Sequence, residues 1–229
     1  MIYNIAIDGP AGAGKSTIAR RVARELSFIY VDTGAMYRAM ALYLLREDVD
    51  RSNTEQIGEI CQNAEISIKY QNGEQIVLLN GENVNAHLRT EEVGNMASIS
   101  SAVPRVREKL LSLQRKLAKD MSVVMDGRDI GTTILPDADV KIYLTASSLT
   151  RAQRRYLELQ EKGAVCNLDE IQKDIEERDQ RDMNREISPL RQADDAILVD
   201  SSTLTIEQVV DRILEIFRLK TKKEVSHES

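Results

Sequence analysis

The sequence predicts an α/β fold in which helices flank a central parallel sheet, with a small antiparallel β insertion and an arginine-rich helical lid. Short apolar runs alternate along the chain with helical patterns, which is typical of parallel sheets. A glycine-rich turn joins the first run to the first helix, and near residue 64 the pattern changes to two-residue alternation. With 229 residues, the chain is long enough for one such core with insertions but short for two enzymes.

The first apolar run, residues 5–8, leads into residues 9–17, which match the P-loop pattern G-x-x-x-x-G-K-[ST]. Glycines let backbone N–H groups approach an anion, and the following helix adds its positive end. Lys15 should reach the β- and γ-phosphates of a nucleoside triphosphate, and the Ser16 hydroxyl should bind the bridging Mg²⁺. A chance glycine turn is disfavoured, because a strand precedes it and an amphipathic helix follows. The expected triphosphate contacts are Gly9, Pro10, Ala11, Gly12, Ala13, Gly14, Lys15, Ser16 and Thr17.

The second apolar run, residues 28–31, predicts another strand, and residues 32–34 have the turn and cap chemistry that starts a helix. Tyr37 falls in the apolar stripe of that helix, so taken alone it is interpreted as a core residue. Arg38 points away from the stripe. Because an arginine just past a strand end is suited to bind phosphate, Arg38 is the better candidate for function.

The later elements follow from the same periodicities. Alternation over residues 66–84, with Asn-Gly turns at 72–73 and 80–81, predicts an antiparallel meander. A capping box of Thr205 and Gln208 predicts the start of the last helix, and the polar residues after 219 are expected to fray. The remaining predicted elements are a helix over 105–119 and strands over 123–125, 140–144 and 196–199.

The segment from Asp126 to Asp129 follows the end of a buried strand, at the edge of an open parallel sheet where ligands bind. Asp126 is placed to hold a Mg²⁺-bound water, and Arg128 to meet a phosphate. Asp129 is placed to accept a hydrogen bond from an exocyclic amine. The alternative is a tight glycine-containing turn stabilised by an Arg–Asp pair.

Seven arginines occur between residues 151 and 191, where planar guanidinium groups could clamp phosphate oxygens. Many acidic residues are interspersed, so for any single arginine a surface ion pair is an equally good interpretation. Four charged residues of the run 178–185 should share one helical face without an apolar stripe. The seven are Arg151, Arg154, Arg155, Arg178, Arg181, Arg185 and Arg191.

Composition limits the function classes. The net charge of −6 argues against a general polynucleotide binder, and no apolar stretch is long enough to span a membrane. The first residues show no secretory leader, so a cytoplasmic location is expected. Cys61 and Cys166 lack metal-binding spacing and are expected to be small buried residues, and two histidines leave little for a triad or a His-rich metal site.

Five blocks taken together, residues 8–17, 32–38, 104–107, 126–132 and 178–185, resemble the bacterial cytidylate kinases of the P-loop NTPase superfamily. The resemblance covers about residues 2–217. It implies a nucleoside-monophosphate kinase fold and transfer of phosphate from ATP, with Mg²⁺, to CMP or dCMP, giving CDP or dCDP. It also implies a core over about 1–60, 90–146 and 192–219, a monophosphate-binding insertion over about 61–89 and a mobile lid over about 147–191. We expect a monomeric, single-domain enzyme whose polar residues 220–229 form a frayed tail.

The resemblance also assigns roles to individual positions. It places the acceptor's phosphate against Arg38, Arg128 and Arg185, the base against Ser98, Arg107 and Asp129, and the ribose against Arg178 and Asp182, with Thr33 and Tyr37 lining the pocket. Lid closure would bring Arg154, Arg155, Arg178 or Arg181 near the γ-phosphate. Two positions depart mildly from the pattern, since Ser16 stands where many relatives have glycine and Thr33 where serine also occurs.

Two other functions are weighed against this one. A kinase for UMP, dTMP or shikimate would share the P-loop, but Asp129 favours an aminated base because a uracil 4-oxo group would repel it. A nucleotide-dependent switch is disfavoured by the absence of an Asn-Lys-x-Asp motif and by the arginine-rich lid.

Overall fold

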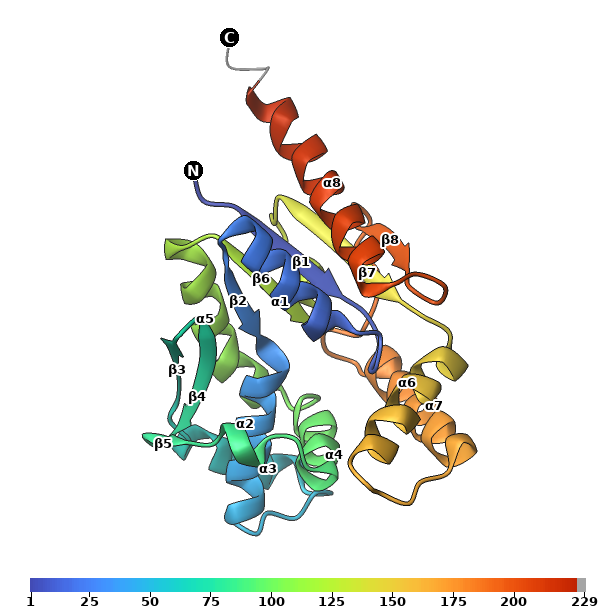
Figure 1. The fold of residues 1–229 in the computed structure, drawn as a ribbon. Coiled ribbons are helices and arrows are strands. Elements are labelled where there is room, and N and C mark those ends of the chain that lie inside the picture. The colour runs from blue at the N-terminus through green and yellow to red at the C-terminus, as the bar shows by residue number, and fades with distance from the viewer. Residues whose placement is uncertain (226–229) are drawn as a thin grey trace.

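The computed structural model describes residues 1–225, which fold around a five-stranded parallel sheet with the strand order β2-β6-β1-β7-β8 (Figure 1). The P-loop leaves the carboxyl end of the central strand, β1. The end of β6 lies beside it, and the end of β2 lies one strand further along. This order therefore brings three sequence-distant segments to one edge of the sheet. The strands are β1 (Asn4–Asp8), β2 (Ile29–Asp32), β6 (Val123–Gly127), β7 (Val140–Thr145) and β8 (Ile197–Asp200).

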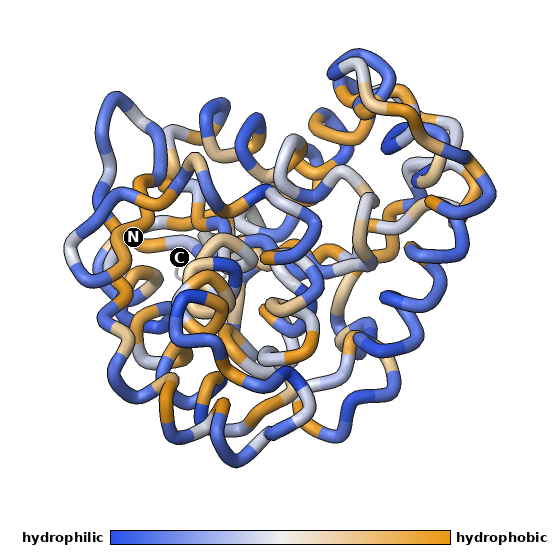
Figure 2. Tube along the Cα trace, turned by 90° about the horizontal axis from the view of Figure 1, so that it is seen from below, coloured by the Kyte–Doolittle hydropathy of each residue, from blue (hydrophilic) through white to orange (hydrophobic). Residues whose placement is uncertain are grey.

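The sheet is covered on both faces, which explains why its inner strands are continuous apolar runs. Ile5 and Ile7 point to one face and pack with α1 and α8, whereas Ala6 points to the other and packs with α2 and α5. All three are fully buried. Along the chain trace, hydrophobic residues concentrate inside and hydrophilic residues at the outer turns (Figure 2).

Side-chain caps start several helices where the sequence predicts. Asp32 accepts a hydrogen bond from the Ala35 N–H at the start of α2, and Thr205 and Gln208 exchange both bonds of the predicted capping box before α8. The helices are α1 (Lys15–Leu26), α2 (Thr33–Arg46), α3 (Thr54–Ile60), α4 (Glu91–Ser100), α5 (Pro104–Asp120), α6 (Ser148–Glu161), α7 (Leu168–Asn184) and α8 (Ile206–Val225). Short helical turns cover Cys61–Asn63, Asn85–His87 and Ile130–Ile134.

The predicted meander is confirmed as an antiparallel sheet of β3 (Ile66–Gln71), β4 (Glu74–Leu79) and β5 (Glu82–Asn83). It contacts the open edge of β2 through side chains. The Gln75 amide accepts from the N–H of Asp32 and donates to its carbonyl oxygen, at 2.9 and 3.1 Å, and the Tyr70 hydroxyl donates to the Tyr30 carbonyl at 3.2 Å. The insertion therefore packs beside the segment that carries Arg38.

Helix α8 continues to Val225, so residues 220–225 of the tail expected to fray have helical backbone, and the fraying itself stays a prediction. The rest of the predicted tail, residues 226–229, lies outside the described residues. Among the helices of residues 1–225, none is long and apolar enough to cross a membrane.

Candidate active site

A cavity of about 650 Å³ opens at the carboxyl ends of β1, β2 and β6, and the P-loop forms one of its walls. Positions of this kind are where open α/β sheets bind ligands. Most of the residues singled out from sequence line it: Ala11, Gly12, Ala13, Gly14, Lys15, Ser16, Thr17, Thr33, Tyr37, Arg38, Ser98, Arg107, Asp126, Arg128, Asp129, Arg154, Arg178, Asp182 and Arg185.

The P-loop wall is shaped by glycines in conformations that other residues rarely adopt. Gly12 and Gly14 have φ angles of 74° and 86°. Gly9 has a φ of 150°, and a Cβ at this position would lie 1.9 Å from the Leu144 carbonyl oxygen. Gly9 and Pro10 do not line the cavity, so they shape the loop from behind.

Lys15 is buried at the base of this wall, where its Nζ donates to the Pro10 carbonyl at 2.7 Å. Burial and the neighbouring Arg128 lower the pKa of this amine well below its ordinary value, against the opposing effect of Asp126. Because the Lys15 ammonium is buried against its own loop, its charged form would be stabilised by any anion that enters the pocket.

Ser16 and Asp126 meet beside Lys15. The Ser16 hydroxyl donates to Asp126 Oδ2 at 3.0 Å, and the Tyr30 hydroxyl donates to Oδ1 at 2.9 Å. Burial raises the pKa of Asp126 to about 6, with Asp32 adding to the effect and Lys15 opposing it. A hydroxyl and a carboxylate at a phosphate loop fit Mg²⁺, which prefers oxygen ligands and keeps several waters. Within residues 1–225, no cluster of three His, Cys, Asp or Glu side chains forms a metal cage.

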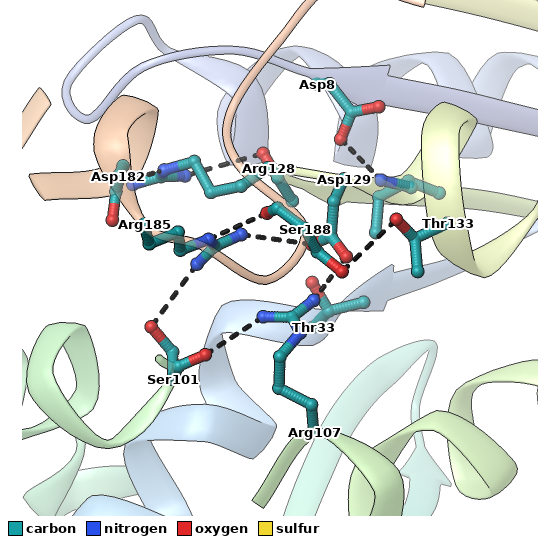
Figure 3. A network of polar contacts seen from close by, with 12 residues as sticks. Asp8, Thr33, Ser101, Arg107, Arg128, Asp129, Thr133, Asp182, Arg185 and Ser188 are labelled. Atoms are coloured by element: carbon teal, nitrogen blue, oxygen red, sulfur yellow. Dashed lines mark hydrogen bonds and ion pairs between the residues drawn. The ribbon is translucent and has the colours of Figure 1, made fainter. Parts of the chain in front are cut away.

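Deeper in the cavity, two of the predicted base-binding residues, Arg107 and Asp129, come together (Figure 3). Arg107 Nη2 donates to Asp129 Oδ2, and Arg185 Nη2 lies 3.5 Å from Asp129 Oδ1. The guanidinium of Arg107 also stacks over Tyr37, 5.5 Å from the ring centre. The buried hydroxyl of Ser98 has no hydrogen-bond partner among the described residues, which makes it available to a ligand.

A group of arginines lies between the P-loop and these residues. Arg128 Nε donates to Asp182 at 2.8 Å, while Arg38 pairs with Asp32 at 3.0 Å. Arg178 has a buried Nε without a hydrogen-bond partner in the described part of the chain. Burial lowers its pKa to about 10, with Arg128 adding to the effect and Asp182 opposing it. Such a group is suited to a phosphate.

Comparison with known proteins decides the family. The family model described as "Cytidylate kinase" matches residues 5–219. The chain is 51% identical to the cytidylate kinase of Caldicellulosiruptor saccharolyticus, over 93% of this chain and 95% of that one. It is 49% identical to the cytidylate kinase of Lactobacillus johnsonii, over 96% of each chain. The chain belongs to the cytidylate kinase family. The predicted family and its kinase activity are confirmed.

A solved structure supports the fold of this cytidylate kinase family member. The gluconokinase from Sinorhizobium meliloti matches with a TM-score of 0.50, over 98% of this chain and 97% of that one, at 13% sequence identity. At this level of identity the likeness concerns the fold alone.

The structure does not bring Arg155 and Arg181 into the cavity of this family member, although the sequence predicts them as catalytic. Both are exposed, and Arg155 pairs with Glu158 at 3.0 Å. The buried face of α7 contains Ile175, Asp179 and Asp182. At about 100° per residue, Arg181 projects more than a right angle away from the middle of that face, whereas Arg178 stays at its border.

Sequence reasoning missed two parts of the site. Arg154 lines the cavity but donates to the Ser201 carbonyl and hydroxyl, at 2.7 and 3.2 Å, so it is held by the loop before α8. That loop and the first turn of α8 line one end of the cavity through Ser201, Leu204, Thr205, Ile206 and Val209, and the capping box of Thr205 and Gln208 was the sequence signal for this region. The second is a buried ion pair outside the cavity, between Arg151 and Asp179, which contacts the P-loop at Ala11.

Asp8, at the end of β1, holds the segment after Asp129 in place. Its two carboxylate oxygens accept the N–H groups of Ile130 and Gly131, each at 2.7 Å. Burial raises the pKa of Asp8 to about 7, although these hydrogen bonds and Lys15 act in the opposite direction. The strand that leads into the P-loop therefore also fixes the backbone beside the predicted base-recognition residue.

Proposed function

We propose that this member of the cytidylate kinase family transfers the γ-phosphoryl group of MgATP in line to the 5′-phosphate of CMP or dCMP. The observation that supports this is one cavity with two unlike walls. The P-loop with Lys15 and Ser16 forms one wall, and Arg107 with Asp129 lies in the other. Between them lie arginines suited to the phosphates of both nucleotides.

The donor would bind along the P-loop, with its adenine against Leu204 of the loop before α8, against Ile206 at the start of α8 and against Arg154. Lys15 would leave the Pro10 carbonyl and contact the β- and γ-phosphates as a point charge. Ser16, and Asp126 through water, would hold Mg²⁺, which neutralises charge on the phosphates as the phosphoryl group moves.

The acceptor's phosphate would lie among Arg38, Arg128 and Arg185, with Arg178 toward the ribose or the γ-phosphate. Because its attacking oxygen is already anionic, the reaction needs alignment and charge neutralisation rather than a general base. The arginines supply both. Closure of α6 and α7 over the bound nucleotides, with Arg155 or Arg181 moving inward, stays a prediction from sequence.

Asp129 would select the base. Its carboxylate is 3% exposed and already meets Arg107 and Arg185, so its oxygens are oriented and poorly hydrated. The 4-amino group of cytosine can donate to such an oxygen, whereas the 4-oxo group of uracil places acceptor against acceptor. Ser98 and Arg107 would donate to the remaining acceptors of the base.

A coupled ADP-release assay with ATP and a panel of nucleoside monophosphates tests the proposal. We expect turnover with CMP and dCMP, much less with UMP, and little ATP hydrolysis without an acceptor. ATP hydrolysis at the same rate without any monophosphate would instead indicate a nucleotide-dependent switch. Turnover with UMP or dTMP equal to that with CMP would overturn the assignment of the base site.

A further inference from the structure

We propose that Arg151 and Asp179, here called the Ala11 clamp, are positioning residues that couple the occupancy of the P-loop to the affinity of the acceptor site. The inference rests on the proposed function for the identity of the two ligands. It concerns two residues that do not face the cavity and to which the transfer chemistry assigns no role.

The clamp is a buried, closed arrangement around one residue of the P-loop. Arg151 Nη1 lies 2.6 Å from Asp179 Oδ2, and both side chains are less than a tenth exposed. Asp179 Oδ1 accepts the N–H of Ala11 at 3.3 Å, and Arg151 Nη1 donates to the Ala11 carbonyl at 2.8 Å. Both backbone polar groups of Ala11 are therefore held by side chains from helices α6 and α7.

The loop also lies close to the side chain of Arg151. A Cβ at Gly12 would lie 3.3 Å from the Cβ of Arg151, so the loop passes directly over α6. Arg151 Nε also donates to the Ala146 carbonyl, at 2.9 Å, which fixes the guanidinium at its other end. A change in the loop when a triphosphate binds would therefore move Arg151 or break its hydrogen bonds.

Helix α7 continues this contact to the acceptor site. Asp179 and Asp182 are one turn apart on its buried face, and Asp182 accepts from Arg128, a predicted ligand of the acceptor's phosphate. The adjacent Arg178 lines the cavity. Ala11 and Arg128 are thus connected through a single rigid helix and two charge-assisted contacts, which is a short physical path for coupling.

A solely structural role would predict a different result. If the pair only held α6 and α7 on the core, its removal would lower stability and weaken both ligands independently. Coupling is instead measured by a coupling factor. This factor is the Kd of an ATP analogue measured without CMP, divided by its Kd measured with saturating CMP. Buried ion pairs can often be replaced by apolar pairs with little loss of stability, so the two roles are separable.

The experiment measures this factor by calorimetry with a non-hydrolysable ATP analogue, Mg²⁺ and CMP. For the wild type we expect a factor of about 5 or more. The coupling factor should fall toward 1 in Asp179→Asn and in the double variant Arg151→Met with Asp179→Leu. Each variant should still show cooperative thermal unfolding. Glu177→Gln is the matched control on the exposed side of α7, and it should keep the wild-type factor.

A wild-type factor of 1, or variants that keep the wild-type factor while losing stability, would overturn the proposal. If those variants do not fold, Arg151→Lys decides, because it keeps the charge but loses the fork that reaches Ala11 and Ala146. Failure of the proposed function is recognised separately, by a wild type that does not turn over CMP in the ADP-release assay. The factor is then measured with the monophosphate that does support turnover.

Discussion

The guanidinium of Arg107 and the carboxylate of Asp129 form a buried ion pair at the deep end of the cavity, and their side chains are 9% and 4% exposed. Arg107 comes from the first turn of α5 and Asp129 from the segment after β6. The pair therefore joins two elements at the point where the base is proposed to bind. The pair holds the Asp129 carboxylate in one position. A carboxylate accepts hydrogen bonds and does not donate them, and this is the property that selection of an amino group requires.

The first prediction concerns that selection. Asp129→Asn should lower kcat/KM for CMP by about 100-fold, or about 3 kcal/mol, because the amide NH₂ can face the cytosine amine. Activity on UMP should change far less, since the repulsion is removed. Steady-state kinetics on both monophosphates provides the measurement, with the exposed Asp137→Asn as the control. Equal loss on CMP and UMP would refute base recognition by Asp129.

The second prediction concerns the donor wall. Lys15→Ala should reduce phosphoryl transfer by at least about a thousandfold, because it removes the positive charge proposed to contact the β- and γ-phosphates. Circular dichroism and thermal unfolding should show a folded protein. Lys119→Ala, a change of the same type on an exposed surface, should keep normal turnover. Near-normal turnover in Lys15→Ala would disprove the P-loop assignment.

The third prediction uses the backbone of the P-loop. Gly9→Ala should lower the free energy of unfolding by about 3 kcal/mol or more, because the new Cβ would collide with the Leu144 carbonyl oxygen, which cannot move away as a flexible side chain would. The control is Gly163→Ala, where φ is 74° and nothing lies within 4 Å, so about 1 kcal/mol is expected. Urea unfolding of both variants measures the difference. Similar losses would mean that only backbone conformation matters at Gly9.

The fourth prediction concerns pH. The pKa of Asp8 rises from 3.8 to about 7 on folding, so the folded state binds this proton more tightly than the unfolded state does. The resulting stabilisation is complete below about pH 4 and is lost as the pH rises to about 7. Relative to Asp8→Asn, the wild type should therefore lose about 2 to 3 kcal/mol of stability between about pH 5 and about pH 8. Urea unfolding at both pH values measures this, and parallel changes in the two proteins would contradict it.

Sequence patterns predicted the elements of the fold well because those patterns are local. The P-loop, the meander and the Thr205–Gln208 capping box each lie within a few tens of residues, where periodicity and turn chemistry determine the outcome. The helical face expected to collect Arg178, Arg181 and Arg185 was only partly right, since Arg185 lies just beyond the end of α7 and Arg181 faces solvent.

The pairings inside the site were less accessible to sequence reasoning. Arg107 and Asp129 are 22 residues apart on different elements, and Arg151 and Asp179 are also on separate helices. Spacing along a chain does not specify which of many arginines meets which of many carboxylates. For the same reason, the exposed Arg155 and the buried Arg151 of one helix could not be told apart before their neighbours were known.

The contact of Gln75 with β2 covers part of an edge of the sheet that another chain could otherwise pair with. An unpaired edge of a parallel sheet offers free N–H and carbonyl groups on which another chain can add a strand and start aggregation. At β2 the Gln75 amide takes both groups of Asp32, and the Tyr70 hydroxyl takes the carbonyl of Tyr30. The insertion thus covers this part of the edge with side chains, at the place where a further strand would otherwise attach.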